Sequence, residues 1–186
     1  MSSGLATRWA LPILIGAAFA VLVWTVTLRA CPFALMPLAM ARIGGEMPAN
    51  TFRHAPPATP ERQPIVRPSP DLLYSSCVFD VSKGPVRVYV PAISGHYWSV
   101  SVFDARTDTV IVRGERHTGG APVRLLLDRG AETDAAERLQ TAAAAGFEPV
   151  ALGYARGIVL VRILVPDPDD VAAVDALRRQ ADCRPV

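Results

Sequence analysis

The chain has 186 residues, 51% of them hydrophobic, and its 19 basic residues nearly balance its 17 acidic ones. This length suits one domain with a membrane anchor and leaves too few residues for two ordinary domains. The basic residues are scattered among carboxylates and do not form one stripe, so the composition argues against a nucleic-acid partner.

Residues 9–28 form an uncharged apolar run between Arg8 and Arg29. As an α-helix this run is about 30 Å long, the thickness of the hydrocarbon core of a bilayer. It is long for a signal peptide, and no good cleavage site follows it. We therefore expect a retained transmembrane anchor, with lipidation of Cys31 as the open alternative.

Prolines punctuate the next part of the chain, with two in an uncharged stretch after the anchor and seven between residues 45 and 70. A short helix at the membrane surface and then an extended arm are the expected structures. The predicted organisation is a cytoplasmic tail and anchor (1–30), a juxtamembrane helix and Pro-rich arm (31–66), and a β-rich domain (67–186).

Alternating apolar and polar residues predict strands in the rest of the chain. The predicted strands are 73–79, 86–90, 97–103, 109–113, 123–127 and 157–165. Short strands at this spacing favour a mainly β fold, an antiparallel sandwich or barrel-like core. Two short helices accompany it, one over 134–145 and one that opens at Asp167.

Residues that carry chemistry are few. His96 enters a strand beside Trp98, where it either faces a pocket or is a satisfied residue at a strand edge. The aspartates at 167, 169 and 170 are explained as the start of a helix. No spacing typical of a zinc site, a nucleophile elbow or a phosphate loop is present, so no metal, cofactor or catalytic residue is predicted.

The cysteines carry information about the compartment. Cys77 lies on the apolar face of a predicted strand, and Cys183 follows the last helix. In an oxidising compartment a Cys77–Cys183 disulfide would tie the C-terminal tail to the core. Two unrelated thiols are the alternative. We favour the disulfide, provided that the domain lies outside the cytoplasm.

The stretch R-P-S-P-D-L-L-Y-S-S-C-V-F-D over residues 67–80 resembles the bacterial family called domain of unknown function 1254. The resemblance continues through 84–91, 95–99, 103–104 and 156–165. It implies a β-sandwich in the bacterial envelope, in a short membrane-anchored form whose second β-rich half is a separate protein. It supplies no catalytic residues. Ser69 departs from the asparagine common in the family, and residues 131–146 have no counterpart.

The motif also has a physical interpretation. Arg67 is placed to pair with Asp71 or Asp80, and a buried tyrosine such as Tyr74 usually finds a hydrogen-bond partner. A structural corner is favoured over a ligand site. The candidates for binding a ligand or a partner are Arg67, Asp71, Tyr74, His96, Trp98 and Asp104.

The flanking charges do not orient the anchor, because Arg8 and the α-amine oppose Arg29 and Arg42. The cysteines and the family resemblance favour a single-pass protein of the bacterial inner membrane with its C-terminal domain in the periplasm. We expect a non-catalytic binding or assembly module that contacts the bilayer through residues 9–28. Its partner would be a separately encoded second half or another copy of the chain. The alternative is a subunit of a hydrolase acting on envelope glycans.

Overall fold

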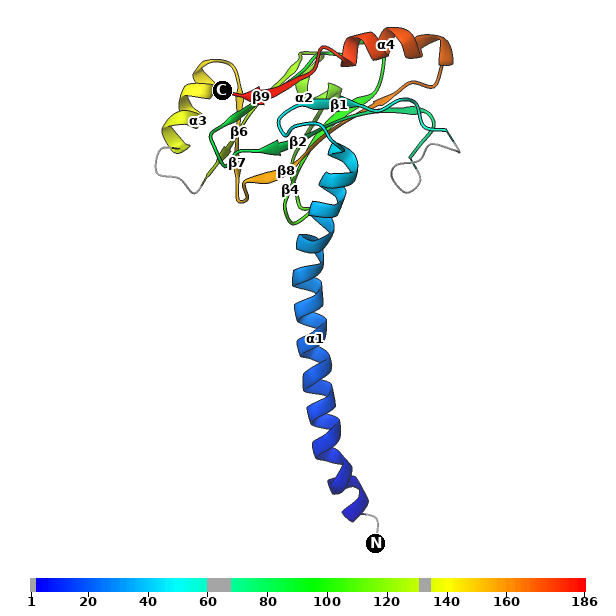
Figure 1. Cartoon of the computed structure of the whole chain (residues 1–186), viewed down its shortest axis with the longest axis vertical. Helices are drawn as coiled ribbons and strands as arrows, with labels where there is room; N and C mark the ends of the chain where they lie inside the picture. The colour runs from blue at the N-terminus through cyan, green and yellow to red at the C-terminus, as the bar shows by residue number, and fades with distance from the viewer. Residues whose placement is uncertain (1–2, 60–67, 131–134) are drawn as a thin grey trace.

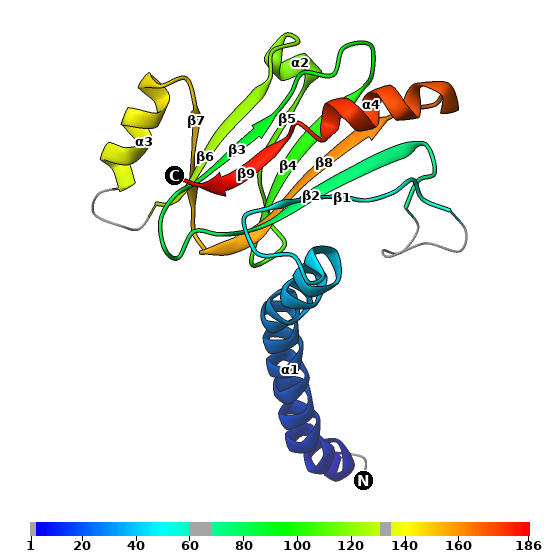
Figure 2. The same ribbon diagram turned by 45° about the horizontal axis from the view of Figure 1, so that its top comes forward.

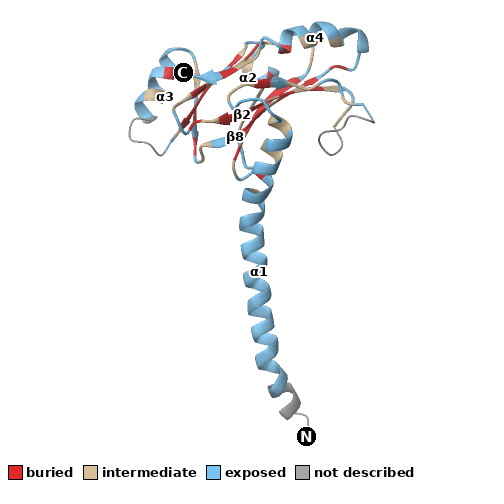
Figure 3. Cartoon of the chain, in the orientation of Figure 1, coloured by how far each residue is buried: buried red, intermediate tan, exposed pale blue. Residues whose placement is uncertain are grey.

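Helix α1 (Ser3–Gly44) projects as a stalk from a β-rich domain (Figure 1). The computed structural model describes residues 3–59, 68–130 and 135–186. Among the described residues one helical segment, Arg8–Gly44, is long and apolar enough to cross a membrane. Figure 3 shows that this stalk is exposed along most of its length and becomes partly covered only where it meets the domain.

The helix is continuous where the sequence predicted two helices. Pro12, Pro32 and Pro37 all lie inside α1. A proline inside an α-helix removes a backbone hydrogen bond and costs about 3 kcal/mol, which is why a break after the anchor was expected. Near the domain the helix makes tertiary contacts, since Met36 is buried and a Cβ atom at Gly44 would lie 3.2 Å from the side chain of Val78.

The strands form two facing sheets (Figure 2). The five-stranded sheet has the order β1 (Phe52–His54), β2 (Leu72–Asp80), β8 (Arg156–Leu164), β4 (Trp98–Asp104) and β5 (Thr109–Gly114). The four-stranded sheet has the order β7 (Glu148–Leu152), β6 (Val123–Arg129), β3 (Val86–Val90) and β9 (Asp182–Pro185). Neighbouring strands are antiparallel except for the parallel pair β6 and β7. The mainly β prediction is confirmed.

The short helices lie outside the two sheets. They are α2 (Glu115–Thr118), α3 (Ala135–Ala144), the 3₁₀ turn η1 (Pro168–Asp170) and α4 (Val171–Arg178). The side chain of Asp167 accepts a hydrogen bond from the amide of Asp169 at 3.0 Å, so it caps the last helical segment as the sequence predicted. Helix α2 occupies a segment that was expected to be a turn.

Strands β1, β7 and β9 were not predicted. Strand β1 comes from the segment expected to be a Pro-rich arm, and it pairs with β2 in the register Phe52 to Cys77. The predicted boundary at residue 67 therefore does not separate an arm from the sheet. All three strands are short, and each depends on a longer neighbour for its pairing.

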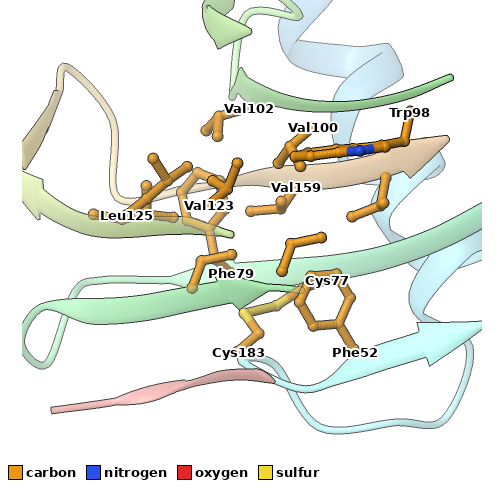
Figure 4. Packing of buried hydrophobic residues seen from close by; sticks show 14 of the residues in the cluster. Phe52, Cys77, Phe79, Trp98, Val100, Val102, Val123, Leu125, Val159 and Cys183 are labelled. Atoms are coloured by element: carbon orange, nitrogen blue, oxygen red, sulfur yellow. A yellow bond between two sulfur atoms is a disulfide. The ribbon is translucent and has the colours of Figure 1, made fainter. Parts of the chain in front are cut away.

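The core lies between the sheets. Cys77, Phe79, Val100, Val159 and Leu125 are all buried there (Figure 4). Within β8, Gly157 passes so close to β4 and β2 that a Cβ atom would overlap the backbone oxygen of Phe103 and the ring of Phe79.

A disulfide joins the two sheets through this core. Cys77 of β2 and Cys183 of β9 are bonded, with a sequence separation of 106 (Figure 4). The predicted pairing is confirmed. The remaining cysteine, Cys31, is free and exposed on α1.

Candidate functional site

The predicted site residues on and before β4 do not converge. His96 lies in the loop before the strand, with its Nε2 atom 3.8 Å from Oδ2 of Asp170. Trp98 is 1% exposed and belongs to the core. Asp104 ends the strand, and six residues of β-strand correspond to about 20 Å. His96 and Asp104 are therefore too far apart to act on one substrate bond.

The carboxylate of Asp104 binds the backbone of the turn that follows β4. Its Oδ1 atom accepts hydrogen bonds from the amides of Arg106, at 2.7 Å, and Asp108, at 3.1 Å. This buried carboxylate thus satisfies the backbone of the β4–β5 connection. The contact explains an aspartate at this position without a ligand.

The motif residues around β2 also make internal contacts. Arg67 lies outside the described residues, and Asp71 is exposed just before the strand. The hydroxyl of Tyr74 accepts a hydrogen bond from the amide of Ser69 at 3.0 Å. Asp80, considered as a partner for Arg67, instead accepts a hydrogen bond from Nε of Arg156 at 2.7 Å.

Burial and the hydrogen bonds from Ser82 and Arg156 act in opposite directions on the pKa of Asp80. Burial raises the pKa of its carboxyl group, but the hydrogen bonds from Ser82 and Arg156 outweigh burial and hold the pKa below its ordinary value. Asp80 is therefore a stable anion within an ion pair, the opposite of what a general acid requires.

A buried arginine that the sequence analysis missed connects α4, β1 and β2. Arg178 is 1% exposed. Its guanidinium group donates to the carbonyl oxygens of Tyr74, at 2.6 Å, and Ala55, at 2.7 Å. It also donates from Nε to Asp175 at 2.7 Å. Arg178 follows Val174 by four residues, so the helical period of the apolar face was a signal for its burial.

His54 completes this polar cluster. Its Nδ1 atom lies 2.9 Å from the hydroxyl of Ser75, which faces the guanidinium of Arg178 at 3.4 Å. Burial, and then the charges of Arg178 and Arg179, lower the pKa of His54, and Asp175 partly opposes them. The cluster joins three elements by charge-assisted hydrogen bonds and so stabilises the fold.

Two adjoining grooves lie on the outer face of the four-stranded sheet. The first has a volume of about 400 Å³ and a mostly apolar lining from β3, β6, α3 and the C-terminus. Its apolar lining residues are Pro85, Leu126, Ala142, Ala145, Phe147 and Val186. We call it the apolar groove.

The second groove shares Arg87 and Phe147 with the first and has a volume of about 320 Å³. Its other lining residues are Tyr89, Arg124, Asp182 and Arg184. We call it the basic groove, because three arginines face one aspartate. Asp182 forms an ion pair with Nε of Arg184 at 2.8 Å and lies 3.8 Å from Nε of Arg87.

The sequence contained a signal for the basic groove. Arg87 and Tyr89 alternate with the buried valines of β3, so both side chains point away from the core. Cross-strand pairing then places Arg124 beside Tyr89 and Arg184 beside Arg87. The pairing partners could not be read from the sequence, and the arginines therefore looked scattered.

Residues suited to a metal do not gather in the described part of the chain, where no three side chains of His, Cys, Asp or Glu lie together. The side chains of the two grooves are of the kind that bind a partner or ligand by contact. Together the grooves combine an apolar depression, two aromatic rings and a surplus of guanidinium groups over carboxylates.

A solved structure shares the fold. The VPA0106 protein of Vibrio parahaemolyticus has a TM-score of 0.64 at 18% identity, over 86% of this chain and 36% of that protein. An uncharacterised protein of Burkholderia cenocepacia matches over 85% of this chain and 40% of its own length, with a TM-score of 0.48 and 14% identity. This chain thus spans little more than a third of the solved proteins it resembles.

No curated protein matches the sequence. A family model does match, over residues 49–185, which include every strand of both sheets. The matched range begins before β1, in agreement with the pairing of that strand to β2. The chain therefore belongs to the family of proteins of unknown function DUF1254.

Proposed function

We propose that this protein is a membrane-anchored binding and assembly module of the bacterial envelope. In this proposal α1 crosses the inner membrane and the β-sandwich lies in the periplasm, where it holds a partner protein that contributes further β structure. The disulfide between Cys77 and Cys183 supports an oxidising compartment, because such bonds are rare in the cytosol.

The pair of adjoining grooves is the observation that carries the proposal. Protein interfaces typically combine an apolar centre with aromatic and arginine side chains and a polar rim. The apolar groove and the basic groove together have this composition, and Arg87 and Phe147 connect them. The matching partner surface presents an apolar side chain to the first groove and carboxylates to the second.

The VPA0106 protein has the fold of this chain in 36% of its own length, so the fold can occur as one part of a longer protein. We propose that the partner of this domain contacts the two grooves and adds β structure to it.

Photo-crosslinking from the groove in native membranes tests the proposal. Ala145 lines the apolar groove and is exposed, so a photoreactive amino acid there replaces no core residue. We expect one principal adduct with a different envelope protein, identified by mass spectrometry. The two purified full-length proteins should then bind each other directly in detergent.

A matched pair of variants gives the specificity of the contact. Ala145→Asp places a carboxylate in the groove, and Ala143→Asp places one on an exposed residue that is not part of the lining. Burying an unpaired charge in an interface costs several kcal/mol, so only Ala145→Asp should abolish the complex. A principal adduct with a second copy of the chain, or equal effects of the two variants, would contradict the proposal.

A further inference from the structure

We propose that the β domain rests directly on the bilayer, with the β4–β5 and β7–β8 turns among the lipid headgroups. This inference builds on the proposed membrane anchor and adds the orientation of the domain and the surface that meets the lipid. The two turns carry Arg106 and Tyr154, respectively. The partner in this contact is the phospholipid headgroup layer of the membrane that α1 enters.

The end of α1 is fixed against the domain at several points. The ring of Phe33 packs edge-on against Tyr154, with 5.6 Å between ring centroids. The guanidinium of Arg106 lies 5.9 Å from the centre of the same ring. Further along the helix Met36 is buried and Gly44 contacts Val78. Contacts spread over three turns of helix fix the direction of the stalk relative to the sheets.

The position of Phe33 along the helix gives the height of the turns above the membrane. If the apolar run ends at Leu28, Phe33 lies five residues further, or about 8 Å along the axis. The headgroup layer on each side of a bilayer is about 5–8 Å thick. The two turns that contact Phe33 therefore reach the outer part of this layer.

The exposed surface of α1 beyond the run supports the same placement. Phe33, Leu35 and Leu38 remain 44%, 53% and 50% exposed, although they follow Arg29 and lie beside the domain. Apolar side chains on a water-exposed stalk would be unfavourable, whereas they are typical of helix surface in the interfacial layer. Tyrosine and arginine, the residues on the two turns, are also favoured at this depth.

A depth measurement on the full chain in vesicles tests the inference. The background is Cys31→Ser, which removes the free thiol and leaves the disulfide intact. Thr107→Cys places a single label in the β4–β5 turn, and Thr118→Cys places one beyond the other end of β5. Each is labelled with an environment-sensitive fluorophore, in phosphatidylethanolamine–phosphatidylglycerol vesicles that contain a headgroup nitroxide quencher.

We expect stronger quenching at residue 107 than at residue 118, by about threefold, because β5 separates the two positions by about 20 Å. Equal quenching in protein that floats with the vesicles would overturn the contact while leaving the anchor intact. Protein that does not float with the vesicles would overturn both the anchor and this inference.

A second pair of variants tests whether docking of α1 sets the orientation. Phe33→Ala removes the ring that touches both turns, and Leu35→Ala removes an exposed side chain two residues away. Only Phe33→Ala should reduce the quenching at residue 107 towards the value at residue 118. Unchanged quenching in Phe33→Ala would overturn the role of this contact.

Discussion

Replacement of Arg178 by alanine probes the contact that joins α4 to the five-stranded sheet. The side chain is 1% exposed and donates to the carbonyl oxygens of Tyr74 and Ala55. Its removal deprives both carbonyl groups of a charged donor and leaves a cavity beneath α4. Asp175 keeps a partner, because Nε of Arg179 donates to its other oxygen at 2.6 Å.

The expected loss in the free energy of unfolding follows from these contacts. A hydrogen bond from a charged group contributes about 1.5–3 kcal/mol, and two such bonds to buried carbonyls are lost. The guanidinium no longer has to be desolvated, which returns part of this free energy. We expect a net loss of about 3 kcal/mol, or about 10 °C in Tm for a domain of this size.

Thermal unfolding of the full chain in detergent, followed by circular dichroism, measures this loss. Arg179→Ala is the matched control, since it removes the adjacent arginine from the same carboxylate but from an exposed position, where an ion pair contributes less than about 1 kcal/mol. Arg178→Lys should fall between the two, because one ammonium group cannot reach all three acceptors. Equal values of Tm for Arg178→Ala and Arg179→Ala would refute the reasoning.

Three further predictions concern the stability of the β domain. The pKa of His54 in the folded protein lies below its ordinary value of 6.5, so the unfolded chain binds a proton at a higher pH than the folded chain does. The stability of the domain should therefore fall as the pH drops from about 6.5 towards the folded pKa. Tm measured between pH 7.5 and pH 5 should show this decline in the wild type and not in His54→Gln. Reduction of the Cys77–Cys183 bond, which links residues 106 positions apart, should lower the free energy of unfolding by about 4–5 kcal/mol. Urea unfolding with and without a reductant measures this loss, and an unchanged midpoint would contradict the prediction. Gly157→Ala should prevent accumulation of folded protein, because the added methyl group would overlap a carbonyl oxygen of β4. Gly153→Ala is the control and should express normally, because the space around this residue is open. Folded Gly157→Ala protein would contradict the prediction and show that the strands can separate.

The longer strands could be predicted because their periodicity is a property of the local sequence. In β2 and β3 buried and partly exposed residues alternate without interruption, so the pattern alone identified their inner faces. Strand β8 was recognised as central by its continuous apolar run, and it does lie in the middle of the five-stranded sheet. The pairing of the two cysteines rested on the inward face predicted for Cys77 and on the oxidising compartment expected for the domain.

Features that depend on distant partners could not be predicted in this way. Strand β9 carries two charged residues and a proline in four positions, and it forms only by pairing with the edge of β3. Arg178 is buried because it donates to the carbonyl oxygens of Tyr74 in β2 and of Ala55 just after β1, which lie more than a hundred residues away in sequence. The grooves likewise depend on the order of strands in the sheet.

These internal contacts change what the family motif means for function. Tyr74 and Ser75 belong to the stretch on which the resemblance was first based, and both supply oxygen atoms to Arg178. Asp80, at the end of the same stretch, binds Arg156 of the neighbouring strand. These polar groups of the motif are thus bound to arginines elsewhere in the domain, and they hold the fold together. The residues that distinguish one member from another in binding should therefore lie on the outer faces, where Arg87 and Phe147 join the two grooves.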